Sequence, residues 1–233
     1  MKTRALAVAA LTLAVLTGSA EAADGDLDVS YDTDGLNSVS FGGSDNVYGG
    51  LLQADGKLVV IGGGRPVANQ EMSVARFNTN GSLDTSFGTS GKFSLDITPA
   101  TTSDRGTCGG QQSDGKLIIG GHTRIGSGND DFAIIRLTTA GVLDPTFGTG
   151  GIVKVDFNGG SDRANALRVL PDDRIVLVGF ASDFLLSPDQ DLGVAVLTRD
   201  GALDTGFDGD GKQTIDIGEQ ADTGQTVDVQ TDG

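Results

Sequence analysis

Hydrophobic and polar residues follow one another in short runs along the chain, and the runs return in a fixed order. A segment of small residues at 164–169 is followed by a nearly continuous apolar run at 174–178 and a third apolar segment at 193–199. After a polar loop, a fourth apolar segment covers 212–217. Runs of this length are typical of strands, and no segment after residue 22 shows the 3.6-residue period of a helix. The pattern therefore predicts an all-β fold with four short strands in each unit.

Corresponding segments occur earlier in the chain, which makes the units repeats. Each unit has a Leu-Asp-x-x-aromatic phrase, whose leucines are 56, 60 and 60 residues apart: Leu27, Leu83, Leu143 and Leu203. An Asp-Gly pair keeps step with this phrase and predicts a two-residue hairpin between the first two strands, with Asp173 replacing the glycine in one copy. Four antiparallel strands in a repeat of about 60 residues indicate a β-propeller. A β-solenoid is the alternative, although its repeats are usually shorter.

The aromatic residue of each phrase is expected to pack between neighbouring blades; these residues are Tyr31, Phe87, Phe147 and Phe207. The segments Asp-Gly-Lys-Leu-Ile-Ile-Gly-Gly at 114–121, Phe-Ala-Ile-Ile-Arg-Leu at 132–137 and Leu-Asp-Pro-Thr-Phe-Gly-Thr-Gly at 143–150 carry a resemblance. The pattern resembles the delta-60 repeat of bacterial exported proteins, and the resemblance covers residues 24–233. It implies a β-propeller-like fold and export, without an assigned general activity. Asp32 and Asp208 depart from the glycine that follows the aromatic residue in the other copies.

The number of strands predicts an incomplete propeller. Three full blades are expected at about 45–97, 104–157 and 162–217. Residues 36–41 would form a lone outer strand before them, and residues 224–229 a lone inner strand after them. Because closed propellers typically have about 4–8 blades, we expect an N-terminal fragment of a longer protein. Further blades of the same chain, or alternatively a second copy, would close the ring.

The N-terminus has the pattern of a secretory signal peptide. Lys2 and Arg4 precede an apolar run at 5–16, and small residues in an Ala-x-Ala pattern end at Ala22. The run is shorter than the roughly 20 residues that span a membrane. We therefore expect residues 1–22 to be a signal peptide. The mature chain, 23–233, would be exported to the periplasm or the extracellular space without a membrane span.

Charge and composition exclude several classes of function. The net charge of −16 argues against binding to nucleic acid or to anionic membrane surfaces. Cys108 is the only cysteine and His122 the only histidine, which excludes an intramolecular disulfide and a metal centre built from several of these residues. His122 has no recognisable nucleophile partner, so no catalytic residue is assigned. Cys108 lies beside two glycines and is expected to be a small buried thiol.

One aspartate precedes each expected inner strand at the same register: Asp45, Asp104, Asp162 and Asp222. In a propeller these four carboxylates, which we call the register aspartates, would lie around one mouth of the channel. Such a ring could bind a cation or the hydroxyl groups of a sugar. The alternative is that each aspartate caps its own turn by accepting backbone N–H bonds. The sequence leaves both interpretations open.

Two of the repeat phrases carry a D-x-x-x-D-x-D pattern followed by glycine, which resembles a calcium loop. The six aspartates are Asp28, Asp32, Asp34, Asp204, Asp208 and Asp210. The pattern lacks the downstream glutamate of an EF-hand, and the two middle repeats have only Asp84 and Asp144. A solvated acidic turn is therefore the alternative. Calcium is the one cofactor that the sequence suggests.

The segments between the second and third strands differ in length and character, at 64–72, 122–130 and 181–191. Variable loops on a regular scaffold are where recognition tends to occur. The sequence therefore favours a non-catalytic module that binds or scaffolds a protein or a glycan. The alternative is a propeller hydrolase or lyase that uses the carboxylates at the channel mouth together with a metal.

Overall fold

A computed structural model of the chain describes residues 26–65, 69–99, 103–126, 128–183, 187–218 and 220–230. The expected signal peptide, 1–22, lies outside the described residues. The described part contains β-strands and no helix, which confirms the all-β prediction.

The strands form three antiparallel sheets of four strands each, in the arrangement of propeller blades. Blade 1 contains β1 (Asn46–Leu52), β2 (Leu58–Gly64), β3 (Glu71–Phe77) and β4 (Lys92–Leu95). Blade 2 contains β5 (Asp104–Gln111), β6 (Leu117–Ile125), β7 (Asn129–Leu137) and β8 (Ile152–Val155). Blade 3 contains β9 (Arg163–Val169), β10 (Ile175–Asp183), β11 (Ser187–Leu197) and β12 (Lys212–Ile215).

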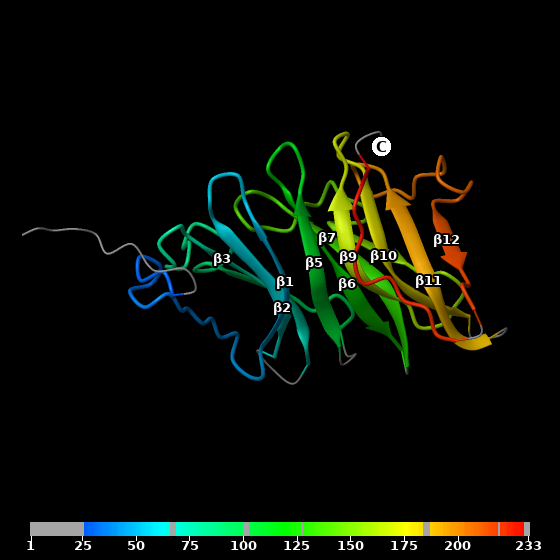
Figure 1. Cartoon of the computed structure of the whole chain (residues 1–233), viewed down its shortest axis with the longest axis horizontal. Coiled ribbons are helices and arrows are strands. Elements are labelled where there is room, and N and C mark those ends of the chain that lie inside the picture. The colour runs from blue at the N-terminus through cyan, green and yellow to red at the C-terminus, as the bar shows by residue number, and fades with distance from the viewer. Residues whose placement is uncertain are drawn as a thin grey trace, which may run out of the picture.

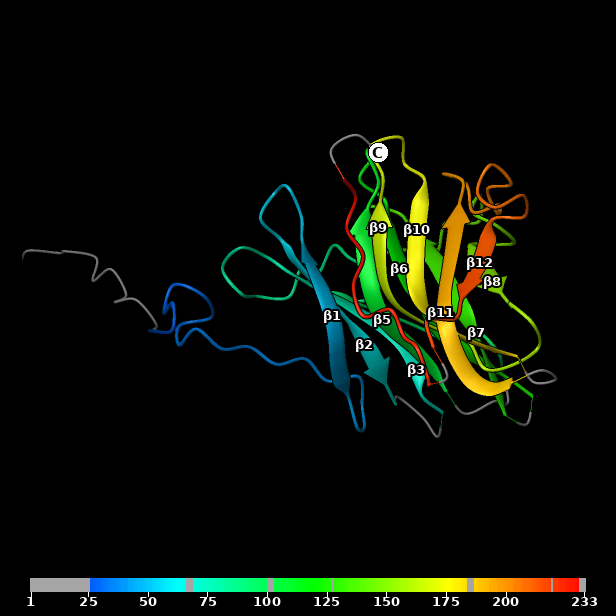
Figure 2. The same cartoon turned by 45° about the vertical axis from the view of Figure 1, so that its right-hand side comes forward.

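The three blades stack face to face, with the first strand of each blade nearest to its neighbours (Figure 1). β1 contacts β5, and β5 contacts β9, while the fourth strands lie at the outer edges of the sheets. Figure 2 shows the same order from a second direction, as an open fan. The described sheets do not close into a ring, as the sequence predicted.

The two lone strands predicted at the ends of the series do not form. Residues 36–41 and 224–229 have no strand structure, because a sheet ladder requires hydrogen bonds to a second strand. The second segment nevertheless lies along blade 3 (Figures 1 and 2). There the Gly224 N–H donates to the carbonyl of Gly179 at 2.9 Å, and the Asn165 amide donates to the carbonyl of Gly224 at 2.9 Å. It therefore occupies the place of an inner strand without being one.

The Asp-Gly turns lie where the sequence places them, but their type differs. The N–H of Gly56 donates to the carbonyl of Gln53, and the N–H of Gln53 donates to that of Lys57, both at 2.9 Å. The loop thus has three residues, and Gly56 follows the turn with a φ of 81°. Asp173 adopts a φ of 68° at the same position, since aspartate tolerates the left-handed region better than most residues.

The apolar core lies between blades as well as within them. Leu117, Ile118 and Ile119 are successive residues of β6, and all three have an exposed fraction of 0%. One core cluster joins blades 1 and 2 and includes Ile61, Met72 and Phe87, and a second joins blades 2 and 3. Burial on both faces of a central strand explains the continuous apolar runs in the sequence.

Two of the four predicted aromatic plugs lie between described blades, while Tyr31 and Phe207, at the two ends of the series, are half-buried. Phe87 and Phe147 are fully buried, and their rings lie against the glycines Gly141 and Gly201 of the next blade. A methyl group at Gly141 would lie 2.6 Å from the Phe87 ring, so only glycine allows this close approach.

Candidate functional site

The aspartate of the repeat phrase is part of the scaffold in blades 1 and 2. Asp84 Oδ2 lies 2.8 Å from both Arg76 Nε and Lys57 Nζ. Asp144 Oδ2 is held in the same way, by Arg136 Nε at 2.8 Å and Lys116 Nζ at 3.1 Å. Although burial alone would raise it, hydrogen bonds and these cations hold the pKa of both carboxyls far below the usual range.

The two arginines of these pairs also connect neighbouring blades. Arg76 Nη1 donates to the carbonyl of Thr139 in blade 2 at 2.8 Å, and Arg136 Nη1 donates to the carbonyl of Arg199 in blade 3 at 2.9 Å. Both guanidinium groups therefore make hydrogen bonds and ion pairs with residues of the blades themselves. The end of the blades that carries the repeat phrase therefore serves mainly to hold the stack together.

The four register aspartates lie at the opposite end of the inner strands, and each accepts a backbone hydrogen bond from the turn before it. The donors to Asp45, Asp104, Asp162 and Asp222 are, in order, the N–H groups of Phe41, Ile97, Phe157 and Ile217. Within the described residues, no group of metal-binding geometry contains two of the four. The contacts have the form of turn caps, and a role in ligand binding stays a prediction.

One register aspartate does belong to a cluster, which we call the carboxylate cluster: Asp131, Asp156 and Asp162. Each offers one oxygen, and these three oxygens lie within 4.8 Å of one another. Strand pairing brings them together, because Phe132 of β7 lies opposite Val155 of β8 and the aspartates are the next residues along. In the described part of the chain this is the one group whose spacing suits a hard divalent cation.

Burial and like charge change the acidity of the carboxylate cluster. Burial, together with the charge of Asp156, raises the pKa of Asp131 to about 6. Burial also raises the pKa of Asp162 to about 6, against the hydrogen bonds from the N–H groups of Phe157 and Ser182 that lower it. At neutral pH the three carboxylates repel one another, so a cation or a proton would be favourable there.

The other two blades carry acidic residues at the same three positions, which the sequence analysis missed. They are Glu71 and Asp96 of blade 1 with Asp104 at the start of blade 2, and Asp191 and Asp216 of blade 3 with Asp222 after its last strand. Burial raises the pKa of Glu71 and of Asp104, and the charge of Asp96 adds to both effects. The signal was present in the sequence, since one acidic residue precedes the third strand and another follows the fourth in every repeat.

The six aspartates of the predicted calcium loops are engaged mostly in local turns. Asp28 Oδ1 accepts the N–H and hydroxyl of Ser30, at 2.9 and 2.6 Å, and hydrogen bonds to Ser30 lower its pKa. Asp34 accepts the N–H of Leu36 at 2.9 Å. In the second loop, Asp204 accepts the N–H of Gly206 and Asp210 accepts the N–H of Lys212. Asp208 has a positive φ, and Asp204 Oδ2 pairs with Arg174 Nη1 at 3.1 Å. Neither loop reaches the spacing of the carboxylate cluster among the described residues.

Two of the three predicted variable loops are largely strand. β6 continues to Ile125 and β7 begins at Asn129, while β10 continues to Asp183 and β11 begins at Ser187. The sequence pattern missed these extensions because they contain polar residues. Strand pairing nevertheless continues through them, as in the pair Arg124 and Asp130. His122 therefore lies in β6 rather than in a loop. Cys108 lies in β5 with an exposed fraction of 9%, and burial raises the pKa of its thiol to about 12.

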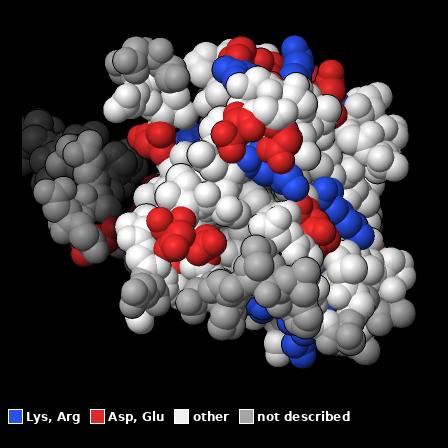
Figure 3. Space-filling view, turned by 90° about the vertical axis from the view of Figure 1, so that its right-hand side faces the viewer, with Lys and Arg blue, Asp and Glu red and all other residues white. Residues whose placement is uncertain are grey.

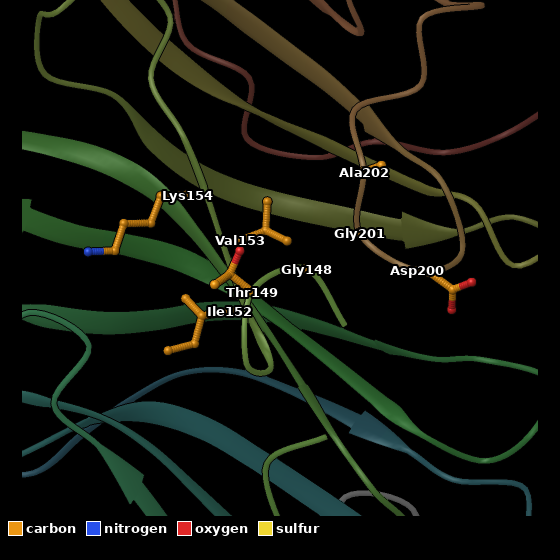
Figure 4. Close-up of a pocket in the computed structure, with 8 residues that line it drawn as sticks. All are labelled: Gly148, Thr149, Ile152, Val153, Lys154, Asp200, Gly201 and Ala202. Carbon is orange, nitrogen blue, oxygen red and sulfur yellow. The ribbon is translucent and has the colours of Figure 1, made fainter. Parts of the chain in front are cut away.

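Two grooves on the outer side of the stack are related by the repeat. One has a volume of about 640 Å³ and lies between Gly148 to Lys154 of blade 2 and the turn Asp200 to Ala202 of blade 3 (Figure 4). The other has a volume of about 630 Å³ and lies between the equivalent segments of blades 1 and 2. The exposed Val142 is on the rim of the second groove. Such paired hollows could hold small groups of a larger ligand.

Charges on the face beside β12 are distributed in several clusters. Acidic side chains gather at separate places with basic side chains between them (Figure 3). The strong net negative charge is therefore not concentrated in one patch on this face.

Comparison with protein families agrees with the repeats. Three segments, residues 53–87, 112–147 and 170–207, match the family model described as "Domain of unknown function (DUF5122) beta-propeller". Each segment begins at the turn after an inner strand and ends at the aromatic plug of the same blade. Each of the three blades thus contains one match to this β-propeller family model. The matches support the resemblance to delta-60 repeats, and a search of curated proteins gave no match. No helix in the described part of this propeller chain is long and apolar enough to cross a membrane.

Proposed function

We propose that this propeller chain is an exported, non-catalytic module that binds or scaffolds a protein or a glycan. The observation that carries the proposal is that the polar residues of the repeat phrase have a structural role. Asp84 and Asp144 form buried ion pairs with the arginines that connect neighbouring blades. A ligand can then use two kinds of surface. One is the end of the stack that carries the register aspartates, and the other is the pair of outer grooves.

Binding is tested directly with the mature chain, residues 23–233, on arrays of glycans and of peptides. The expected result is retention of one ligand class that is lost when the outer groove is blocked by Ala202→Arg. The matched control is Val29→Arg, at an exposed position outside both grooves. Binding that survives the blocking substitution would move the site to the opposite end. A uniformly negative array would contradict the proposal.

Export has its own measurement. The N-terminal sequence of the protein recovered from the periplasm or culture medium should begin at Ala23. A product that keeps residues 1–22 and stays inside the cell would overturn this part of the proposal.

Calcium stabilisation belongs to the same proposal and has two candidate locations, the predicted loops and the carboxylate cluster. A ligand that binds only the folded state raises the melting temperature. If the cluster binds calcium, the rise should be lost in Asp131→Asn with Asp156→Asn and kept in Asp204→Ala with Asp208→Ala. The reverse result assigns calcium to the loop. No rise in the unaltered chain removes calcium from the proposal and leaves ligand binding intact.

The raised pKa values of Asp131 and Asp162 favour one rival function, a hydrolase or lyase. Carboxyls that titrate near neutral pH can serve as acid and base. In that case the ligand from the array would be cleaved, and Asp131→Asn would abolish cleavage but not binding. An intact ligand after prolonged incubation rejects this rival.

We also propose that β1 is covered in the assembled protein by further blades of the same chain or by a second copy. Val47 and Leu52 of β1 have exposed fractions of 65% and 72%, and a set of apolar side chains in water favours association. Light scattering on the mature chain should show a dimer, and Leu52→Asp should make it monomeric. A monomer before the substitution would exclude the second copy.

A further inference from the structure

The only histidine of the chain lies inside the contact between blades 2 and 3. His122 belongs to β6 and has an exposed fraction of 3%. Its Nδ1 atom is buried and has no hydrogen-bond partner. A buried polar atom without a partner is uncommon and needs a reason. The same register holds Gly63 in blade 1 and Phe180 in blade 3, so the basic side chain is particular to blade 2.

Next to His122, an ion pair between a buried carboxylate and a partly exposed arginine connects the two blades. Asp130 of β7 has an exposed fraction of 0%. Arg163 of β9 reaches it with Nε at 2.7 Å and Nη2 at 2.5 Å from Oδ2. Arg124 of β6 lies on the other oxygen, with Nε at 3.1 Å from Oδ1. The two charge-assisted contacts from Arg163 to this one oxygen link blades 2 and 3 at this end of the stack.

Positive charge surrounds the imidazole. The charged groups that act on it are Arg105 from β5, Arg124 from β6, Asp130 from β7 and Arg163 from β9. Burial disfavours the imidazolium most, and the three guanidinium groups together outweigh the single carboxylate. The pKa of His122 is therefore lowered to about 4.

We propose that His122 is an acid-sensitive switch whose protonation weakens the Asp130–Arg163 pair and loosens blade 3 from blade 2. An imidazolium adds a fourth cation around one buried carboxylate, and it competes with Arg163 for that carboxylate. Like charges in a poorly solvated site repel one another, which is destabilising. The inference does not depend on a ligand and is separate from the proposed function.

The sign of the pH effect follows from the lowered pKa. An unfolded histidine titrates near about 6.5, so the unfolded chain takes up the proton first. The stability linked to His122 is complete above that pH and is lost as the pH falls toward 4. Between pH 7 and pH 5 the equilibrium constant for folding should fall on the order of tenfold through this residue.

Cys108 offers a local probe of the same interface. It is the only cysteine, and it packs in the core cluster with Ala164 and Leu167 of blade 3. Its reaction with a dipyridyl disulfide, which labels thiols in acid as well as at neutral pH, reports opening of the two blades. Rates are divided by those of free cysteine at each pH. Between pH 7 and pH 5 the reaction should speed up on the order of tenfold more in the unaltered chain than in His122→Phe. The carboxylate cluster contributes the same acid response to both proteins and cancels in the comparison.

The control variant is Arg168→Ala, which removes an exposed partner of Asp228 and should keep the full increase. Equal acid responses of the unaltered chain and His122→Phe would overturn the switch.

Proton NMR on the unaltered chain measures the titration of His122 directly, whether or not His122→Phe folds. Because the chain has one histidine, its ring signal needs no assignment. The signal should titrate well below the ordinary histidine range, and Arg163→Gln should shift the midpoint upward. A midpoint at or above the ordinary value would overturn the proposal.

Discussion

At the scale of single residues, one arginine in each of the first two blades performs three tasks. Arg136 pairs with Asp144, donates to a carbonyl of blade 3, and places its guanidinium carbon 4.9 Å from the ring centre of Phe147. Arg76 repeats the arrangement with Phe87 at 4.6 Å. Blade 3 has Val196 at this position, and among the described residues Arg174 is the one ion-pair partner of Asp204. The repeat phrase is therefore explained by packing between blades.

Replacing Arg136 by methionine should strongly destabilise the chain. The side chain has an exposed fraction of 1%, and its loss leaves Asp144 with Lys116 as its remaining ion-pair partner among the described residues. Removing one partner of a buried ion pair typically costs about 3–5 kcal/mol. Urea denaturation followed by circular dichroism measures the change. Arg168→Ala, in an exposed pair, should change stability by less than about 1 kcal/mol. Similar values for both variants would contradict a central role for the buried pair.

At the scale of elements, the inner strands show why small residues recur there. A methyl group at Gly106 of β5 would lie 2.7 Å from Ile61 in blade 1, and Ala164 takes the equivalent place in β9. β1 has Val47 at this register, where no described blade packs against it and the side chain is largely exposed. Crowding by the preceding blade, rather than strand propensity, therefore limits the size of this residue.

The substitution Gly106→Val should separate crowding by the preceding blade from strand propensity. Three added carbons would have to displace Ile61 and Met72, and overpacking of this kind costs about 1–3 kcal/mol. Val47→Ala, the matched change at the same register of β1, should stay within about 1 kcal/mol. Thermal unfolding of the two variants measures the difference. A harmless valine at position 106 would show that the blades are less closely packed than the structure indicates.

At the scale of the whole molecule, the sequence predicted the blades well because every signal occurs several times. The plug Phe87 and the turn at Gly56 were found in this way, through a shared register with other copies. The carboxylate cluster was not, because Asp131 and Asp156 are far apart in sequence and meet only through the pairing of β7 with β8. The isolated segment 36–41 was assigned as a strand from composition, although strand structure depends on a partner.

The two ends of the stack have opposite electrostatic character. At the end with the repeat phrase, ion pairs compensate the aspartates, and their pKa values are lowered. At the other end, burial and neighbouring carboxylates raise the pKa values of Glu71, Asp131 and Asp162. The first arrangement stabilises the fold at neutral pH, and the second opposes it. Acid therefore acts in opposite directions on the two ends, in addition to its effect through His122.

The raised pKa of Asp131 makes the repulsion among these carboxylates measurable. Asp131→Asn should stabilise the chain at pH 7 in the presence of a chelator, because it removes a charge that burial and Asp156 disfavour. The folded pKa of about 6 lies above the unfolded value of 3.8, so the folded state binds the proton more tightly. The penalty is complete above pH 6 and disappears as the pH falls below the unfolded value.

The gain at pH 7 should be about 1 kcal/mol, since solvent screens a half-buried carboxylate, and it should vanish near pH 4. The protonation of His122 is common to both proteins and cancels in their difference. Urea midpoints of the two proteins across this pH range measure the effect, with Asp208→Asn as an exposed control outside the cluster. An advantage that is absent at pH 7, or that persists unchanged at pH 4, would show that the carboxylates of this end do not repel one another in the folded chain.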